Sequence, residues 1–260
     1  MSIALPARAK LNLDLAVLGR RPDGYHDVRT TLQAIDVHDL ITVAPADRTA
    51  LTTSGLAMAN PSSNSVLKAL AVLEQATHQE LPTRIHLHKR IPPGSGMGGA
   101  SSDAAAALRA LAALHHVAAN LTAIAGAIGA DVPFFLAGGT AIAEQRGDHL
   151  TPIPTQPQWY AIAWPGLELQ TPDVYRAWDT MKNLPKTEPN QLTEAAMSIE
   201  SRVREFANAL NSHQEGWQMT GSGSAFFKRC ADEQDAKETA ARLKSLKCWT
   251  AIAQSVGCWD

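Results

Sequence analysis

The chain has 260 residues, a length that suits one large domain or two smaller ones with room for a substantial core. Hydrophobic residues make up 45% and charged residues 18%, and the formal net charge at pH 7 is −2. This balance is typical of a globular enzyme, and it offers no excess positive charge for nucleic acid or an anionic membrane, so we expect neither partner.

The cysteines and histidines predict neither a disulfide framework nor a metal centre. The three cysteines, Cys230, Cys248 and Cys258, stand late in the chain without CxxC spacing, which favours a reducing compartment. His86 and His88 share one face of an expected strand, but no acidic or cysteine neighbour makes them a metal site. The sequence shows no signal peptide and no apolar run of about 20 residues, so we expect a cytoplasmic protein.

The first part of the chain predicts strands joined by turns and one helix. Alternation of apolar and polar residues indicates four strands, over residues 10–19, 26–35, 40–44 and 84–89. A turn cluster over 19–24 makes the first two a hairpin, whereas 47–63 has little pattern. Asn64 is expected to open a helix, because apolar residues follow it at helical spacing.

The second part of the chain also mixes helices and strands. Helices are expected over 104–114, 121–128, 171–181, 192–210 and 232–246. Strands are expected over 138–145, 159–164, 217–220, 225–229 and 248–253. Three prolines within 151–158 suggest a boundary between a domain of residues 1–153 and one of 154–260. The β-α-α-β-β-α-β order of the second domain predicts an open antiparallel sheet backed by helices.

A glycine-rich stretch before the 104–114 helix carries the clearest chemical signal. Gly94, Gly96, Gly98 and Gly99 stand within six residues. Glycine allows positive φ and close approach of a ligand to the backbone. The three N-cap residue types that follow at 101–103 mark a helix start, where free N–H groups and the helix dipole favour an anion. The stretch therefore predicts a phosphate site.

Other interpretations of this stretch are weaker. Gly94-x-Gly96-x-x-Gly99 matches the dinucleotide fingerprint, but no acidic residue follows at the end of a second strand about 20 positions on. No Gly-Lys-Ser or Gly-Lys-Thr follows, so it is not a Walker A loop. An ordinary glycine-rich turn between a strand and a helix remains the structural alternative.

A single acid, Asp131, lies between a glycine and an apolar segment interrupted by Pro133. Acidic residues are rarely buried without a partner or a role, so the carboxylate is a candidate functional group. It is also a good N-cap ahead of a proline, and position alone leaves both interpretations open.

Three stretches together resemble the motifs of the GHMP kinases: Ala-Lys-Leu-Asn at 9–12, the loop at 92–102, and Thr-Gly-Ser-Gly-Ser at 220–224. Two more, Asp-Gly-Tyr-His at 23–26 and Gly-Ala-Asp-Val-Pro-Phe at 129–134, are similar to the members that phosphorylate 4-diphosphocytidyl-2-C-methyl-D-erythritol. The five stretches follow one another in order over nearly the whole chain.

The sequence departs from the family pattern at two positions and in one length. Arg8 stands where the first motif usually has proline, and Ala100 takes the third position of a Gly-Gly-Gly-Ser-Ser run. The segment between Ala44 and Asn64 is also short.

The resemblance implies an α+β two-domain GHMP kinase fold, with an N-terminal domain like ribosomal protein S5 domain 2 and a ferredoxin-like C-terminal domain. It implies transfer of the γ-phosphate of ATP, with Mg²⁺, to the 2-hydroxyl of the cytidine-linked substrate in the non-mevalonate isoprenoid pathway. A monomer or weak homodimer acting on this small molecule is expected.

The resemblance also assigns residues. Lys10 and Asp131 match the catalytic pair: the carboxylate accepts the hydroxyl proton, and the ammonium keeps that carboxylate ionised and stabilises developing charge. The residues expected to bind ATP are Pro92, Pro93, Gly94, Ser95, Gly96, Met97, Gly98, Gly99, Ala100, Ser101, Ser102, Asn64 and Lys89. The residues expected to bind the second substrate are Asn12, Tyr25, His26 and Tyr175.

Two rival functions remain. Another GHMP kinase, of the homoserine or mevalonate type, would have no use for the Tyr25–His26 pair, because its substrate carries no base to stack. A non-catalytic nucleotide-binding relative would be favoured by the loss of Lys10 or Asp131, and both are present. Tyr175 itself has a simpler alternative role in helix packing.

Overall fold

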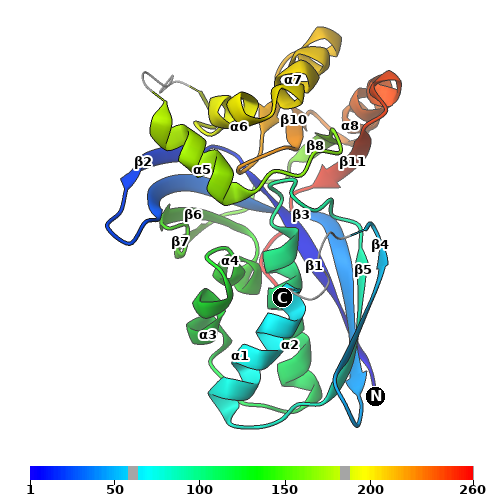
Figure 1. The fold of residues 1–260 in the computed structure, drawn as a ribbon. Helices are drawn as coiled ribbons and strands as arrows, with labels where there is room; N and C mark the ends of the chain where they lie inside the picture. The colour runs from blue at the N-terminus through cyan, green and yellow to red at the C-terminus, as the bar shows by residue number, and fades with distance from the viewer. Residues whose placement is uncertain (58–63, 182–187, 260) are drawn as a thin grey trace.

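A computed structural model describes residues 1–57, 64–181 and 188–259 of the chain. Its strands form a seven-stranded sheet from the first part of the chain and a four-stranded sheet from the second (Figure 1). This confirms the predicted α+β class. Within the described ranges, no helix combines the length and apolar content that a membrane crossing requires.

One long strand organises the first sheet. β3 pairs with four other strands, and the members of the sheet are β1 (Ile3–Asn12), β2 (Ala16–Arg20), β3 (His26–Pro45), β4 (Ala50–Gly55), β5 (Thr83–Lys89), β6 (Thr140–Gln145) and β7 (His149–Ile153). The two strands predicted over 26–35 and 40–44 are therefore one. The single strand predicted over 10–19 is divided into the end of β1 and β2. Between them, the Asp14 carboxylate accepts hydrogen bonds from the Thr31 amide (2.6 Å) and hydroxyl (2.8 Å), which interrupts the strand.

Two edge strands of this sheet were not predicted. β4 is mostly exposed and lacks alternation of buried and exposed residues, so its sequence looked like a loop. β7 contains Pro152, which suggested a linker, but β7 pairs only with β6 and an edge strand tolerates proline. A domain boundary between residues 153 and 154 remains a prediction.

Four helices cover one side of the first sheet (Figure 1): α1 (Ser65–Thr77), α2 (Gly99–Leu114), α3 (Leu121–Ile128) and α4 (Val132–Ala137). As predicted, Asn64 caps α1, and its side chain accepts a hydrogen bond from the Val66 amide at 2.9 Å.

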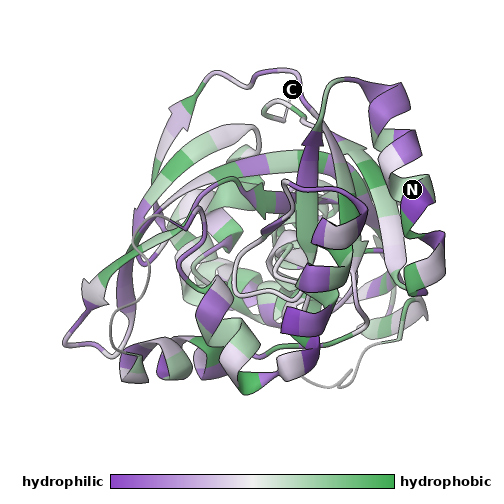
Figure 2. Cartoon of the chain, turned by 90° about the horizontal axis from the view of Figure 1, so that it is seen from above, coloured by the Kyte–Doolittle hydropathy of each residue, from purple (hydrophilic) through white to green (hydrophobic). Residues whose placement is uncertain are grey.

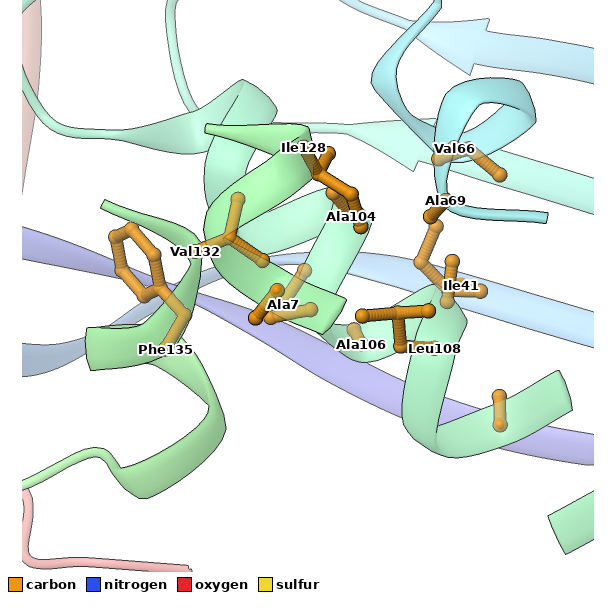
Figure 3. Close-up of a cluster of buried hydrophobic side chains, with 14 of the residues drawn as sticks. Ala7, Ile41, Val66, Ala69, Ala104, Ala106, Leu108, Ile128, Val132 and Phe135 are labelled. Carbon is orange, nitrogen blue, oxygen red and sulfur yellow. The ribbon is translucent and has the colours of Figure 1, made fainter. Parts of the chain in front are cut away.

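The alanine run of α2 fixes the glycine loop in place by packing deep into the core. Small side chains let α2 lie close to β1 and α1, and Figure 3 shows Ala104 and Ala106 of α2 in one cluster with Ala7 of β1 and Ala69 of α1. Val132 and Phe135 bring α4 into the same cluster.

The second sheet is open and antiparallel, as predicted. Its strands are β8 (Trp159–Trp164), β9 (Gln218–Met219), β10 (Phe226–Cys230) and β11 (Trp249–Gln254), in the order β11-β8-β10-β9. The helices of this part are α5 (Thr171–Thr180), α6 (Thr193–Ile199), α7 (Ser201–His213) and α8 (Glu233–Arg242), followed by the 3₁₀ turn η2 (Leu243–Leu246). Figure 2 shows hydrophilic and hydrophobic residues side by side along the outer helices, as expected for helices with one face on the core.

The helix predicted over 192–210 is interrupted. Glu200 takes an extended conformation (φ −143°) between α6 and α7, and its carboxylate accepts a hydrogen bond from the Arg202 amide. The break lets α6 and α7 turn independently against the same sheet, because one residue ends the first helix and caps the second.

Candidate active site

A cavity of about 920 Å³ gathers the predicted site residues. Its lining comes from β1, the turn before β3, the glycine loop, the start of α4, α5 and the loop after β9. Among the residues in its wall are Lys10, Asn12, Tyr25, His26, Asn64, Lys89, Asp131 and Tyr175. Residues far apart in sequence therefore line one cavity.

The glycine loop ends directly in the N-terminus of α2. The helix begins at Gly99, with Gly98 at the N-cap in the left-handed region (φ 73°) and without a side-chain cap. The predicted capping role of the polar residues at 101–103 is therefore wrong, because they lie inside the first turn. Because no side chain forms a capping hydrogen bond there, the first backbone amides of α2 are free to bind an anion in the cavity.

Most of the predicted loop residues face the cavity, but two do not. Met97 is fully buried, and its carbonyl accepts a hydrogen bond from the Lys10 amide at 3.0 Å. Ser102 is also buried, and its amide donates to the Gly98 carbonyl as the helix begins. Both support the loop from behind, whereas Ser101 lines the cavity.

The glycine loop is in contact with the Thr220–Ser224 loop, although the sequence separates them by more than 100 residues. The amide of Ser224 donates to the Gly94 carbonyl at 3.3 Å, and the amide of Ala225, directly after the loop, donates to the Ser95 carbonyl at 3.0 Å. Gly96 has φ 80°, and a Cβ there would lie 2.2 Å from the Thr220 carbonyl oxygen. Only glycine permits this approach, so the two motifs depend on each other.

Lys10 lies where these two loops meet. Its ammonium donates to the side-chain oxygen of Asn12 and, at 2.6 Å, to the Gly96 carbonyl. A Cβ on Gly221 would lie 3.0 Å from the Lys10 nitrogen. Burial lowers the pKa of Lys10, and the nearby negative charge of Asp131 raises it in part. The cation is thus largely desolvated, which strengthens its interaction with any charge that develops beside it.

Asp131 occupies the N-cap position of α4, but its side chain makes no capping hydrogen bond. Its backbone is helical at this point (φ −80°, ψ −14°), so capping does not explain the carboxylate. Asp131 and Lys10 line the same cavity, and within the described residues they form no direct ion pair. The carboxylate therefore remains available to accept a proton.

Two aromatic side chains, Tyr25 and Tyr175, also line the cavity. Tyr25 is 55% exposed, and the Arg146 guanidinium lies 5.2 Å from its ring centre. Tyr175 is instead stacked on His26, with ring centroids 4.7 Å apart and planes at 21°. Burial, reinforced by the charge of Asp131, raises the pKa of Tyr175. Each ring thus has one neighbour, His26 beside Tyr175 and Arg146 beside Tyr25, but Tyr25 is the more exposed of the two and offers the freer surface for a flat ligand.

Asp179 was not predicted as a site residue. Its carboxylate lies 2.7 Å from Nε2 of His26 and holds the imidazole against Tyr175. Asp179 follows Tyr175 by four residues on α5, so the two share a helix face, and this spacing could have identified it. No comparable sequence signal points to Arg146.

Lys89 sits deeper in the wall than expected for a simple nucleotide contact. Its ammonium lies between two carboxylates, 2.5 Å from Asp39 and 2.7 Å from Asp103. Burial disfavours the ammonium, but the two acids outweigh this effect and raise the pKa of Lys89. Burial also raises the pKa of Asp103 to about 8, which the Lys89 charge opposes and the Asp39 charge reinforces.

This buried group predicts a pH-dependent stability. Because the folded-state pKa of Asp103 is raised, the folded protein holds a proton between about pH 4 and pH 8 that the unfolded chain releases, so stability falls as pH rises through this window. Between pH 6 and pH 8, the wild-type unfolding free energy should fall by about 2 kcal/mol more than that of Asp103→Asn, measured by urea denaturation. Parallel curves for the two proteins would contradict the assignment.

The fold and the cavity, with a glycine loop at a helix start, are typical of an α/β enzyme that binds a phosphate-bearing ligand. The family model of the GHMP kinases N terminal domain matches residues 64–139. The chain is 35% identical over 262 residues to the 4-diphosphocytidyl-2-C-methyl-D-erythritol kinase of Aromatoleum aromaticum. The alignment covers 95% of this chain and 91% of the relative. The chain belongs to the 4-diphosphocytidyl-2-C-methyl-D-erythritol kinase family, within the GHMP kinases, and is a small-molecule kinase.

Two solved structures have a fold similar to that of this chain. A crystal structure of 4-(cytidine 5'-diphospho)-2C-methyl-D-erythritol kinase is similar with a TM-score of 0.83 and 34% identity, over 98% of this chain and 100% of that one. A homoserine kinase from Cytophaga hutchinsonii has a TM-score of 0.72 at 17% identity, over 99% of this chain and 95% of that one. The second likeness concerns the fold alone. The predicted GHMP kinase fold is confirmed.

Proposed function

We propose that this kinase transfers the γ-phosphate of ATP to the 2-hydroxyl of 4-diphosphocytidyl-2-C-methyl-D-erythritol, a step of the methylerythritol phosphate route to isoprenoids. One observation carries the proposal: a single cavity joins an anion-binding glycine loop to an exposed aromatic ring, and Lys10 and Asp131 line the same space. The family of the relatives supports the same reaction.

Each part of the cavity has a separate role in phosphoryl transfer. The free amides at the start of α2 hold the ATP phosphates, and Asn64 contributes to the nucleotide end, whereas Lys89, held between Asp39 and Asp103, supports this part of the wall from behind. Asp131 accepts the proton of the attacking hydroxyl. The desolvated ammonium of Lys10 stabilises the negative charge that spreads over the transferring phosphoryl group. The rest of the catalysis is positioning, to which Asn12 contributes on the side of the acceptor alcohol.

Mg²⁺ would neutralise phosphate charge in this site when bound with ATP. The cavity wall fits a hard cation that keeps several waters, because the Ser101 hydroxyl lines it and phosphate oxygens supply the remaining ligands. We further propose a cytoplasmic enzyme that acts as a monomer or weak homodimer.

The assignment of Tyr25 to the cytosine base is open to a direct test. Stacking on a base is worth about 1–3 kcal/mol, so Tyr25→Ala should raise the Kd of the cytidine substrate by about 5- to 150-fold and leave the Kd of ATP unchanged. Isothermal titration with each ligand separately measures both values.

A conservative variant provides the control. Tyr25→Phe keeps the ring and should bind the cytidine substrate nearly as well as the wild type, because stacking needs only the aromatic face. A loss of ATP affinity with unchanged cytidine binding in Tyr25→Ala would show that the two ends of the cavity have been assigned in the wrong order.

A further inference from the structure

The helix that carries Asp131 at its start is held at its other end by residues from distant parts of the chain. α4 has only six residues, too few for a helix to be stable by itself. The carbonyl of Phe135 accepts a hydrogen bond from the indole nitrogen of Trp259 at 2.8 Å, and that of Ala137 accepts from the Trp259 amide at 3.2 Å. The Leu136 carbonyl between them accepts from Arg109 of α2 at 2.9 Å.

Trp259 also contacts the strand that carries Lys10. The guanidinium groups of Arg8 and Arg109 each lie 4.9 Å from its ring centre. A cation over an indole ring is attracted to the ring face. Arg8 precedes Lys10 by two residues on β1, with a shift in the pairing register with β3 between them, so the position of Arg8 bears on the backbone directly before Lys10.

The segment that delivers Trp259 follows a defined path across the two sheets. After β11, the Val256 amide donates to the Ala34 carbonyl of β3 at 3.0 Å, and Cys258 forms an antiparallel bridge with Gly138 directly after α4. Gly139 has φ 76°, and a Cβ there would lie 2.8 Å from the Cys258 sulfur.

We propose that Trp259 is a positioning residue for phosphoryl transfer, which links the end of α4 to β1 through Arg8 and so fixes Asp131 relative to Lys10. The inference rests on the proposed function. It also explains why arginine at position 8, where the family usually has proline, is useful in this chain: the Arg8 guanidinium contacts the Trp259 ring.

Hydrophobic packing of α4 against the core cannot substitute for the hydrogen bonds at its C-terminal end. Val132 and Phe135 anchor one side of α4 in the buried cluster with Ala7 (Figure 3). That contact fixes the helix against the core but leaves the three carbonyls at its end without partners if Trp259 and Arg109 are removed. Unpaired carbonyls favour fraying of the last turn, and in a helix of six residues the fray reaches the N-cap.

The test combines kinetics with hydrogen exchange. Trp259→Ala should lower kcat by about 10²-fold, the effect of a misplaced catalytic group, with the KM for ATP within about 3-fold of the wild type. Amide exchange over residues 132–138 should accelerate in the same variant, while exchange in α2 stays slow. Trp259→Phe keeps an aromatic ring near the two guanidinium groups and removes the indole donor, so it should recover most of the rate.

Cys258→Ser is the matched control, since it alters the same segment without touching the ring contacts, and it should match the wild type in both measurements.

Unchanged exchange over 132–138 in Trp259→Ala would overturn the proposal whatever the enzyme's substrate proves to be. So would an equal change in the KM for ATP and in kcat, or a Trp259→Phe variant no better than Trp259→Ala. Should Trp259→Ala fail to fold, Trp259→Phe alone decides: loss of the indole donor must speed exchange over 132–138 relative to the wild type, while exchange in α2 stays at the wild-type rate. A wild type inactive on the cytidine substrate refutes the proposed function separately.

Discussion

Asp131→Asn is expected to lower kcat by about 10²–10⁴-fold, the contribution of a positioned general base. The carboxylate lines the cavity without a capping hydrogen bond, so the amide should fit in its place with little structural change. The amide cannot take the hydroxyl proton, whereas the ATP phosphates are held elsewhere, at the start of α2. The Kd of ATP should therefore remain within a few-fold of the wild type, as measured by titration alongside steady-state kinetics.

Asp47→Asn is the control for this variant, because it removes a carboxylate from an exposed position in the first part of the chain. It should leave both kcat and nucleotide affinity unaltered. If Asp131→Asn retained more than about a tenth of the wild-type kcat, proton acceptance by Asp131 would contribute too little for the role assigned to it.

Gly96→Ala is expected to abolish ATP binding at millimolar concentrations. The residue has φ 80°, and its new methyl group would lie 2.2 Å from the Thr220 carbonyl and 3.0 Å from the Gly223 amide nitrogen. Both obstacles are backbone atoms, so the glycine loop and the Thr220–Ser224 loop must separate. Lys10 loses its carbonyl partner when the loop moves, and the phosphate site at the start of α2 loses its shape.

The control is Gly126→Ala in α3, where no atom lies within 4 Å of the added methyl. Alanine favours a helix over glycine by about 1 kcal/mol, so this variant should bind ATP normally and unfold at slightly higher urea. Wild-type ATP affinity in Gly96→Ala would mean that the two loops are not coupled in solution. Circular dichroism of both variants separates local distortion from loss of the fold.

The candidate site was easier to predict from the sequence than its surroundings. Four glycines ahead of an alanine-rich helix have a local physical meaning, and the resemblance over five ordered stretches pointed to Lys10 and Asp131, which line one cavity. The strand pattern was less reliable at the edges of the sheet. β4 is mostly exposed, and Pro152 resembles a linker residue until its position at the edge is known.

Contacts between distant segments could not be predicted from the sequence. The stack of His26 on Tyr175 joins positions about 150 residues apart, and periodicity within a strand or helix carries no information about such a pair. The same holds for the ion group of Lys89, whose partner Asp39 lies on the long central strand. Arg8 stood out in the sequence only as a departure from a motif, and its contact with Trp259 depends on the folded path of the last residues.

The most direct test of the proposed reaction is a coupled ADP-release assay with ATP, Mg²⁺ and 4-diphosphocytidyl-2-C-methyl-D-erythritol, with homoserine and mevalonate in parallel reactions. We predict turnover with the cytidine compound and none with the other two alcohols. Turnover with homoserine or mevalonate and none with the cytidine compound would contradict the roles of Tyr25 and His26, and silence with all three would contradict the kinase activity itself.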